Sequence, residues 1–414
     1  MSKLQELIER LCPDGVPLRL FADVLDFRRG QTITEKDAIT GDYPVIAGGQ
    51  KPAYYHNKYN RSGETIAVAG SGAYAGYVSW WTTPIFLSDA FSVHPKDATL
   101  LPKYVYYVMV NMQQRIHNTK KGSGVPHVHG SSIAKFEIPV PPIEVQEEIV
   151  KILDRFADYA AELQAELQAR KEQYEYYRNL LLTFNPSACG CGTDGAQEIG
   201  LTPWGGHSYE VIFKTMGEIG TFFGGLTGKS KSDFTNGNAR FISYMNVYTN
   251  LSINQNMEEF VHIGEAEKQN VLEYGDALFT GSSETPEECG MSSVVTEEPK
   301  EPLYLNSFCF GFRLNDKNLF APDFLKHLLR SKAIRTQITK TANGVTRFNV
   351  SKKLFAKIIL PIPPIELQEK IAAILDRFEA LVNDLTQGLP AEIAAVKEQY
   401  EYYRNKLLTF KKLA

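Results

Sequence analysis

The chain has 414 residues, of which 43% are hydrophobic and 22% are charged, so it can bury several hydrophobic cores. No run approaches the ~18 apolar residues of a membrane span, so we expect no membrane partner and a cytoplasmic location. The net charge of −4 argues against a protein that coats nucleic acid through a uniformly basic surface. Any DNA contact must therefore come from local basic clusters.

Residues 1–139 are predicted to form a first globular domain. Short β-branched and aromatic runs bounded by Gly, Asn and Pro predict strands at 65–69, 77–81 and 90–94. Behind Pro102, apolar residues follow helical spacing as far as His117, which predicts a helix. The domain is therefore expected to be α+β.

The loop after this helix, residues 118–129, carries the first candidate DNA contacts. It places lysine beside Gly, Ser and His, a combination suited to phosphate neutralisation and hydrogen bonding to base edges. A solvated basic loop is the alternative. The two histidines alternate along a strand and share one face, but no third ligand can be named, so we predict no metal. The candidates are Lys120, Lys121, Ser123, His127 and His129.

Two glycine-rich segments of the same domain are weaker candidates for DNA contact. One is the turn around Gly30, and the other is the loop that follows the strand predicted at 65–69. Guanidinium, amide and hydroxyl groups at such turns donate hydrogen bonds to phosphates and bases. The candidates are Arg28, Arg29, Gln31, Ser71 and Tyr74.

Residues 140–185 are predicted to form a long helix with a heptad pattern. From Ile149 to Phe184 the apolar positions alternate in steps of four and three, with only Arg170 out of type. One helix over residues 143–184 would be about 60 Å long at about 1.5 Å per residue. A surface helix packed only on its own domain is the alternative to helix pairing.

A linker rich in Gly, Ser, Cys and Thr, residues 185–200, opens the second globular domain, residues 186–361. Its Cys189-Gly190-Cys191 spacing fits a reduced thiol pair better than a zinc site. Residues 219–225 parallel 24–30, and residues 275–279 parallel 63–68, mainly in apolar residues and Gly. We therefore expect the same fold with a different surface. Strands are predicted at 241–244, 277–280 and 308–314, and a helix at 322–339.

The loop after this second helix, residues 339–353, recurs at the same place and again combines Lys with Gly, Thr and Asn. In a major groove, Arg347 is suited to guanine and Asn349 to adenine. The acidic stretch 258–301 conflicts with DNA binding, and we expect it to lie away from the duplex. The candidates in this domain are Lys229, Lys231, Ser282, Ser283, Lys340, Asn343, Thr346, Arg347 and Asn349.

Residues 362–414 repeat the helical segment. Residues 141–147 recur as 363–369, and residues 171–179 as 397–405. Two consecutive steps of four in the second copy predict a break at Gly388-Leu389-Pro390, where Gly suits a helix end and Pro a first turn. Antiparallel pairing within the chain buries both apolar stripes. The predicted pairing residues are Leu153, Phe156, Leu163, Leu167, Tyr174, Tyr177, Leu375, Phe378, Leu385, Tyr400 and Tyr403.

Motifs of catalysis are absent from the sequence. The glycines at 70–76 miss the dinucleotide fingerprint, and Gly228-Lys229-Ser230 lacks the upstream glycine of a P-loop. There is no Gly-x-Ser-x-Gly elbow and no Asn/Asp-Pro-Pro-aromatic motif of amino-methyltransferases. We therefore predict that the chain is not an enzyme.

The repeated helical motifs resemble the specificity subunits of Type I restriction-modification enzymes. The resemblance rests on Pro-Pro-Ile-Glu-x-Gln-Glu, on Ile-Leu-Asp-Arg-Phe at 152–156 and 374–378, and on Lys-Glu-Gln-Tyr-Glu-Tyr-Tyr-Arg-Asn-x-Leu-Leu-Thr-Phe. It covers the whole chain. It implies an α+β fold with two similar target-recognition domains, separated and followed by long helices that pair as an antiparallel coiled coil.

The same resemblance implies a DNA-reading subunit whose two domains each read one half of a split, asymmetric double-stranded DNA site. It implies that the helices hold two methyltransferase subunits and that restriction motor-nuclease subunits join them. S-adenosylmethionine, ATP and Mg are then expected on those partners, with no cofactor in this chain. Because recognition loops vary within the family, no base-contacting residue is carried over.

Three other functions remain possible from the sequence. The first is a specificity subunit of a related system whose partner fuses methyltransferase and nuclease. The second is a coiled-coil scaffold without DNA readout, which would bind proteins but give no sequence-dependent footprint. The third is a two-domain enzyme, which would show activity in the isolated chain.

Overall fold

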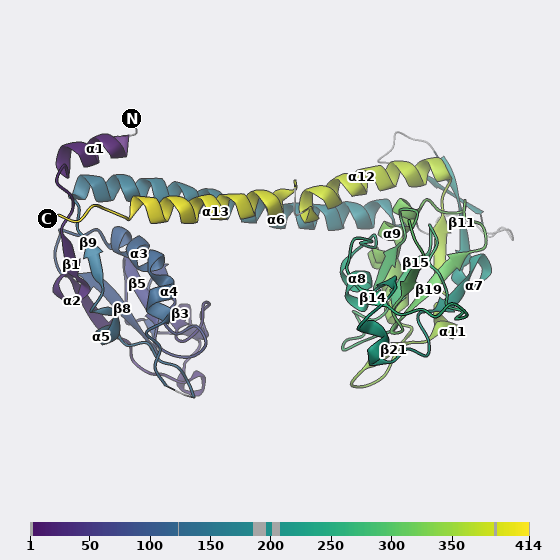
Figure 1. Cartoon of the computed structure of the whole chain (residues 1–414), viewed down its shortest axis with the longest axis horizontal. Coiled ribbons are helices and arrows are strands. Elements are labelled where there is room, and N and C mark those ends of the chain that lie inside the picture. Colours follow the sequence, from purple (N-terminus) through teal and green to yellow (C-terminus); the bar gives the residue numbers. More distant parts are fainter. Residues whose placement is uncertain (1–2, 123, 185–195, 201–207, 385–386, 414) are drawn as a thin grey trace. The chain divides into compact units, whose positions relative to one another are not determined.

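The structure is a computed structural model, and it describes residues 3–122, 124–184, 196–200, 208–384 and 387–413. The chain divides into two compact units, residues 1–165 with 391–414 (unit 1) and residues 166–390 (unit 2). Helices α6 (Ile143–Leu181) and α13 (Leu389–Leu407) each contribute to both. Each unit contains one globular domain beside long helices (Figure 1), which confirms the predicted fold class.

The globular domain of unit 1, domain 1, is built on a four-stranded antiparallel sheet in the order β2-β8-β5-β6. A smaller sheet has the order β4-β3-β7, and β1 pairs with β9. The strands are β1 (Leu18–Leu20), β2 (Leu25–Arg29), β3 (Tyr43–Ile46), β4 (Tyr54–His56), β5 (Thr65–Ala69), β6 (Val78–Trp81), β7 (Phe86–Leu87), β8 (Ala90–Pro95) and β9 (Glu137–Pro139).

Helix α3 (Pro102–Asn111) packs on β5, β6 and β8 of this sheet. It begins at Pro102, whose fixed φ suits a first helical turn. The single helix predicted over 102–117 is interrupted, because the backbone at Met112 has a ψ of 12°. The helices are α1 (Lys3–Leu11), α2 (Phe21–Val24), η1 (Glu35–Asp37), α3 (Pro102–Asn111), α4 (Gln113–His117) and α5 (Gly130–Ile133).

The globular domain of unit 2, domain 2, repeats the sheet arrangement of domain 1. Its main antiparallel sheet has the order β12-β19-β15-β17, and its smaller sheets are β14-β13-β18, β10-β11-β22 and β16-β21-β20. The strands are β10 (Ala196–Gly200), β11 (Ser208–Thr215), β12 (Gly220–Gly224), β13 (Ala239–Ile242), β14 (Phe260–Val261), β15 (Ala277–Thr280), β16 (Ser282–Ser283), β17 (Ser292–Val294), β18 (Leu303–Leu305), β19 (Cys309–Leu314), β20 (Ala342–Asn343), β21 (Phe348–Val350) and β22 (Ile359–Ile362).

The helices of domain 2 also match those of domain 1. The predicted helix over 322–339 is interrupted at Ser331, whose backbone is extended with a ψ of 151°. The helices are α7 (Met216–Ile219), η4 (Lys231–Phe234), α8 (Tyr244–Thr249), α9 (Pro322–Arg330), α10 (Lys332–Thr339) and α11 (Lys352–Phe355). The duplication read from the sequence therefore extends to strand order and helix order.

In unit 1, α6 pairs with α13. The ring of Phe156 stacks on Tyr403, with centroids 5.4 Å apart and planes 25° apart. Three residues further along α6, the Tyr159 hydroxyl donates to Glu392. Because numbers rise along α6 while they fall along α13, the pair is antiparallel. The first part of α6 also packs on its own domain, since Leu153 is fully buried in the core of domain 1. Both packing arrangements weighed for this helix therefore occur.

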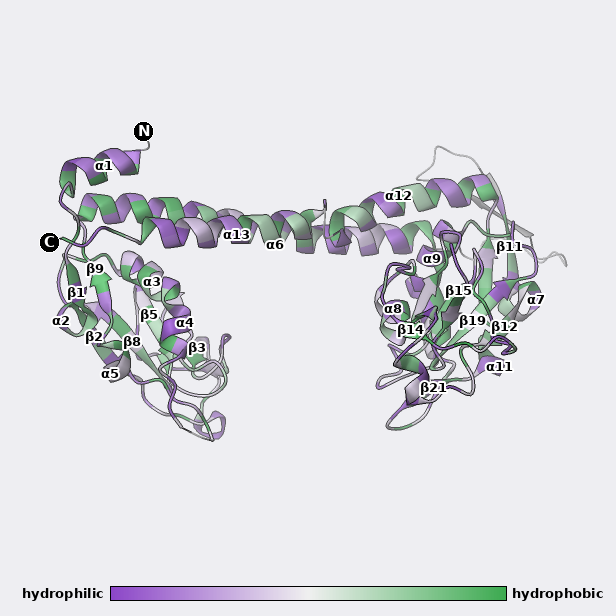
Figure 2. Cartoon of the chain, viewed as in Figure 1, coloured by the Kyte–Doolittle hydropathy of each residue, from purple (hydrophilic) through white to green (hydrophobic). Residues whose placement is uncertain are grey.

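In unit 2, α6 lies beside α12 (Ile365–Asn383). The ring of Tyr177 stacks on Phe378, with centroids 5.5 Å apart and planes 23° apart. Tyr174 and Leu375 are buried in the core that α9 also lines. Figure 2 shows apolar residues recurring among polar ones along α6 and α12, as the heptad pattern requires.

The predicted break near Gly388 is present. Helix α12 ends at Asn383 and α13 begins at Leu389, with Pro390 in its first turn. A side chain at Gly388 would place its Cβ 2.6 Å from the Ala380 carbonyl oxygen, so only glycine fits. Leu385 lies outside the described residues.

A buried glutamine ties α6 to domain 1. The amide oxygen of Gln146 accepts a hydrogen bond from the Leu101 backbone N–H at 2.9 Å. Its amide nitrogen donates to the carbonyls of Thr99 and Pro141, both at 2.8 Å. Gln146 is fully buried, so the side chain satisfies groups that water cannot reach.

The same arrangement recurs in unit 2. Gln368 accepts from the Ala321 N–H at 2.9 Å and donates to the carbonyls of Leu319 and Pro363. It is 1% exposed. The glutamine of each Pro-Pro-Ile-Glu-x-Gln-Glu motif therefore fixes a long helix to the start of a domain helix.

No described helix is both long enough and apolar enough to cross a bilayer.

Candidate nucleic-acid interface

In domain 1 the candidate loop after α4 folds back as a hairpin. The Lys121 N–H donates to the His127 carbonyl at 2.9 Å, and the His127 N–H donates to the Lys121 carbonyl at 2.8 Å. On its other side His127 forms a bridge with Ser71. The next residue, Val128, donates to the Gly70 carbonyl at 2.9 Å. The sequence-predicted residues Lys121, His127 and Ser71 are thus neighbours, joined by two single β-bridges.

In domain 2 the loop after α10 forms the corresponding hairpin. Strands β20 and β21 pair Asn343 with Asn349, and β16 pairs Ser282 with Asn349 on the other side. Val350 donates to the Gly281 carbonyl at 3.0 Å. Three more predicted residues, Asn343, Asn349 and Ser282, therefore lie together in the sheet β16-β21-β20.

The two hairpins have the same turn. Gly122 and Gly344 each begin the turn with a positive φ, 111° and 145°, a conformation that favours glycine. Each hairpin returns to the pairing strand after the same number of residues, because Lys121 pairs with His127 and Asn343 with Asn349. After the role proposed for them below, we call residues 121–127 the first reading hairpin and residues 343–349 the second reading hairpin.

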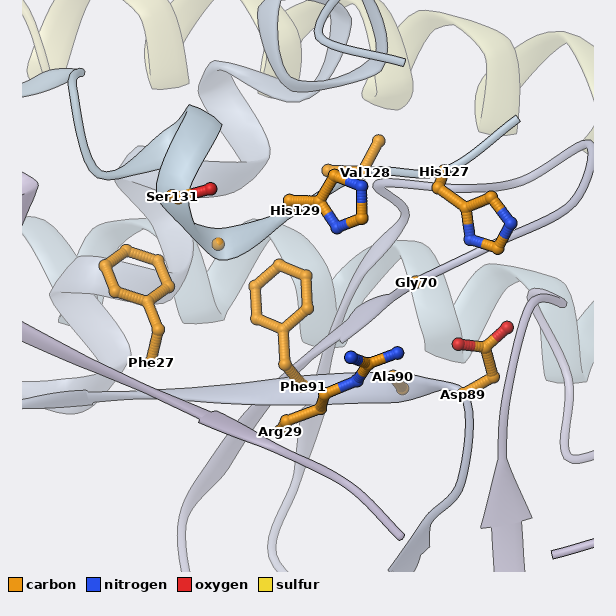
Figure 3. A pocket seen from close by; sticks show the side chains of 11 residues that line it. Phe27, Arg29, Gly70, Asp89, Ala90, Phe91, His127, Val128, His129 and Ser131 are labelled. Carbon is orange, nitrogen blue, oxygen red and sulfur yellow. The ribbon is translucent and has the colours of Figure 1, made fainter. Parts of the chain in front are cut away.

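The first reading hairpin borders a hollow of about 230 Å³ (Figure 3). The rings of His127 and His129 are parallel, with centroids 6.2 Å apart. In Figure 3 they lie across the hollow from Arg29 and Asp89. The hollow thus combines a cation, an anion and two imidazoles, which offer both hydrogen-bond donors and acceptors.

The second reading hairpin borders a hollow of about 420 Å³, and its arginine is held in place. The Arg347 Nε donates to the Ser282 hydroxyl at 3.1 Å, while Ser282 itself is buried. At the tip, Val345 is 91% exposed. The hollow is lined by Tyr244, Met245, Tyr248, Ser282, Ser283, Glu284, Glu288, Thr346 and Arg347.

Several predicted contact residues lie near the hairpins or turns, but they differ in solvent exposure and in whether another group of the chain already binds them. Arg28 is exposed and lies 3.4 Å from Asp26, while Arg29 and Gln31 are exposed. The Lys120 ammonium donates to the Ala73 carbonyl at 2.9 Å. Tyr74, Lys231 and Lys340 are exposed, and Ser123 lies outside the described residues.

Lys229 and Ser283 are engaged inside domain 2. The side chain of Lys229 is 7% exposed, and its ammonium contacts the Glu267 carboxylate and the His262 carbonyl, both at 2.5 Å. The buried Ser283 hydroxyl donates to Glu288 at 3.2 Å. A phosphate would have to displace these partners, so both residues fit a structural role better than the predicted contact.

Several carboxylates of the acidic stretch 258–301 form ion pairs within domain 2. Arg313 bonds to Glu273 and Asp276, and Arg240 contacts Glu301 at 2.8 Å. Glu284 and Glu288 of this stretch line the same hollow as Arg347. Their carboxylates are acceptors, and base amino groups are donors. The expectation that the stretch lies away from the duplex stays a prediction.

One polar cluster of unit 2 was missed by the sequence analysis. The buried His327 forms a hydrogen bond at each ring nitrogen. The Tyr174 hydroxyl lies 3.1 Å from Nδ1, and the Asp376 carboxylate lies 2.7 Å from Nε2. Burial, followed by the charge of Glu379, raises the pKa of Tyr174 to about 12. Burial would raise the pKa of Asp376, but hydrogen bonds from His327 and Lys326 lower it. Only the heptad position of Tyr174 marked this cluster in the sequence.

Among the described residues, His327, Asp376 and Glu379 form a group with metal-ligand spacing. An ammonium already lies there, since Lys326 Nζ is 2.9 Å from Asp376 and 3.3 Å from Glu379. We therefore assign the cluster a structural role between α6, α9 and α12. The prediction of no metal stays a prediction.

Comparison with known families gives the deciding observation. The family described as "Type I restriction modification DNA specificity domain" matches residues 14–172 and 210–395, once in each half. The chain belongs to this family. The first match contains the first reading hairpin and most of α6, and the second contains the second reading hairpin and all of α12, so the two halves are two DNA specificity domains. The resemblance stated from the repeated helical motifs is confirmed.

Individual relatives of this Type I specificity protein agree with the family match. The specificity subunit of Type I restriction enzyme EcoR124I/EcoR124II from Escherichia coli is 31% identical over 396 residues, 86% of this chain and 89% of that one. A putative Type I specificity subunit from Haemophilus influenzae is 25% identical and covers 98% of both chains.

Solved structures share the fold of this Type I specificity protein. The specificity subunit from M. genitalium has a TM-score of 0.55 at 17% identity and covers 95% of this chain and 96% of that one. A chain from a study of Type I complex assembly and conformational transition has a TM-score of 0.56 at 16% identity, covering 96% and 98%.

Proposed function

We propose that this Type I specificity protein reads a bipartite, asymmetric double-stranded DNA site, one half-site with each domain. One observation carries the proposal: the two reading hairpins share backbone pairing and turn glycine but present different side chains. Two hairpins with the same backbone arrangement but different polar side chains are suited to recognising two different base sequences.

Phosphate contacts would come from exposed cations around the hairpins. Arg28, Arg29 and Lys121 lie in domain 1, and Lys231 and Lys340 in domain 2, all exposed. Because the net charge of the chain is −4, we propose that partner subunits supply the remaining phosphate contacts. Binding should therefore weaken with salt less steeply for this chain alone than for the complex.

The proposed partners on the long helices are two methyltransferase subunits, one per repeat. Tyr176 and Tyr402 occupy the same place in the duplicated motif and are 63% and 59% exposed. Each packs edge-on against the next tyrosine, at 5.4 and 5.3 Å. Burial cannot explain why exposed tyrosines are identical in both copies, whereas binding the same partner twice does.

We further propose that catalysis occurs on partner subunits. The chain would act as the non-catalytic specificity subunit in the cytoplasm, with S-adenosylmethionine on the methyltransferases and ATP and Mg on the restriction motor-nucleases. The names of the Escherichia coli relative and of the complex-assembly study support such an assembly.

Methylation sequencing tests this function. Cells expressing the chain together with its methyltransferase partner should carry adenine methylation at one bipartite motif, and cells lacking the chain should not. Replacing Lys340, Asn343 and Arg347 together by alanine should reduce that methylation while the partner still binds. Methylation that does not depend on the chain would overturn the proposal.

A further inference from the structure

We infer that Arg347 and Asn349 in domain 2 occupy the same base-facing positions as Val125 and His127 in domain 1. These positions would decide how the two half-sites differ in sequence. The inference rests on the proposed function and adds the side chains that carry its selectivity.

The pairing of the second reading hairpin places its polar side chains on one face. Asn349 lies in β21, and Arg347 comes two residues earlier, just before that strand begins. Asn343 and Ser282 lie directly opposite Asn349 on either side, and directly opposed residues also share a face. The bond from Arg347 Nε to the Ser282 hydroxyl shows that Arg347 lies along this face.

The face is accessible and projects from the domain. Asn343, Arg347 and Asn349 are exposed, while Phe348 between them is half-buried. Figure 1 shows β21 at the end of domain 2 that lies away from α12. The major groove of DNA is about 12 Å wide and admits a β-hairpin such as the one that β20 and β21 form.

The chemistry of the second hairpin favours two kinds of base. The Ser282 hydroxyl accepts from the Nε of Arg347. The two terminal amino groups of the Arg347 guanidinium are the donors that pair with O6 and N7 of guanine. The Asn349 amide presents a donor and an acceptor, which match N7 and N6 of adenine. We therefore expect a guanine and an adenine in the half-site read by domain 2.

The first reading hairpin has the same backbone pairing but different side chains. Val125 corresponds to Arg347 and offers only apolar contact, which suits the methyl group of thymine. His127 corresponds to Asn349, and Lys121 to Asn343. The position equivalent to Ser282 is Ser71, so the serine is kept while the neighbouring chemistry changes.

The residue beside each hairpin also differs between the two domains. Gly70 donates to the Asp89 carbonyl at 2.9 Å, and Gly281 donates to the Phe308 carbonyl at 2.8 Å, so Asp89 and Phe308 are equivalent. Asp89 is a half-buried acceptor, whereas Phe308 is a 61% exposed aromatic ring. The difference between the two domain surfaces therefore extends past the hairpin strands.

The test gives domain 2 the side chains of domain 1. The full-length chain with Asn343→Lys, Arg347→Val and Asn349→His is assembled with its methyltransferase, and selected sequences are read from a randomised duplex library. The half-site of domain 2 should change, while the other half-site and the spacer stay the same. Loss of the guanine contact should lower discrimination at that letter about 10- to 100-fold.

Two single variants serve as matched comparisons. Arg347→Lys keeps the charge but not the paired donors, so it should lower the discrimination for guanine at that position of the half-site and retain nonspecific binding. Lys340→Ala removes a neighbouring exposed charge, so it should weaken binding to all sequences equally and change no letter. Thermal unfolding of each complex confirms that the variants fold.

Three results would overturn the inference. The first is a three-residue exchange or an Arg347→Lys variant that selects the original letters at full discrimination. The second is a change in both half-sites at once. The third is loss of all binding in a complex that unfolds at the original temperature. If the unaltered complex selects no bipartite site, the proposed function itself fails, and this outcome is separate from the others.

Discussion

Phe156 stacks on Tyr403 in the same geometry in which Phe378 stacks on Tyr177, at 5.4 and 5.5 Å between ring centroids. The four residues are equivalent by the sequence duplication, and each stack lies within one unit. We predict that Phe156→Ala lowers the free energy of unfolding by about 2 kcal/mol, less than for a fully buried ring because Phe156 is half-buried. Urea denaturation measures the change.

The matched variant is Phe378→Ala, which removes the equivalent ring in unit 2. A similar loss of stability is expected there. Unchanged denaturation midpoints in both variants would show that these stacks do not stabilise the helix pairs.

The buried glutamines provide a second prediction. Gln146→Met keeps the side-chain length but leaves the Leu101 N–H and the Thr99 and Pro141 carbonyls without their partner. We expect a loss of about 2 to 4 kcal/mol in unfolding free energy, because unpaired buried groups are costly. Gln368→Met should behave alike. A loss below the error of calorimetry in both variants would contradict this role.

The exposed tyrosines provide a third prediction. Tyr176→Ala and Tyr402→Ala should each weaken the binding of one methyltransferase subunit by about 10-fold or more, as for an interface hot spot. The double variant should lose both subunits. Mass photometry counts the bound subunits, and unchanged thermal unfolding serves as the control. Full occupancy in the double variant would place the partner surface elsewhere.

The ion pair of Glu267 predicts a pH dependence. Hydrogen bonds from Lys229, Gln269 and the Gly264 N–H lower the pKa of Glu267 from 4.5 to about 2. A depressed folded-state pKa stabilises the fold above the unfolded value, and the effect is lost as pH falls from about 4.5 to about 2. Glu267→Gln should therefore lower the unfolding temperature at neutral pH.

The difference between Glu267→Gln and the unaltered chain should shrink across that same acidic range. Differential scanning calorimetry as a function of pH measures it. A difference that stays constant through the range would mean that another group carries the effect.

The break between α12 and α13 provides a fifth prediction. Deleting residues 388–391 removes Gly388, which lies against the Ala380 carbonyl, together with Pro390 of the next helical turn. We expect disturbed helix pairing or a changed spacer between half-sites, with the letters of each half-site unchanged. Methylation sequencing reports both quantities. Altered letters would contradict the separation of spacing from reading.

The sequence predicted the repeated scaffold well because its signals are local. The heptad spacing gave α6 to within a few residues, and Gly388 with Pro390 located the break. The matched basic loops predicted after the two helices contain both hairpins, but the strand pairing and the glycine turns at Gly122 and Gly344 came only from the structure.

Long-range contacts were not predictable from one sequence. Lys229 looked like a free cation beside a glycine turn, but its partner Glu267 is 38 residues away. His327 carried no pattern at all, because its partners Tyr174 and Asp376 come from two separate helices. Interruptions at Met112 and Ser331 were missed for a related reason, since apolar spacing continues across both.

The partners of Gln146 have a consequence for protein engineering. Every atom that this side chain binds is a backbone N–H or carbonyl, and the same holds for Gln368. A transplanted domain of the same fold would bring these atoms whatever its side chains. Chimaeras joined just before residue 141 or residue 363 should therefore keep a working attachment between foreign domain and native helix.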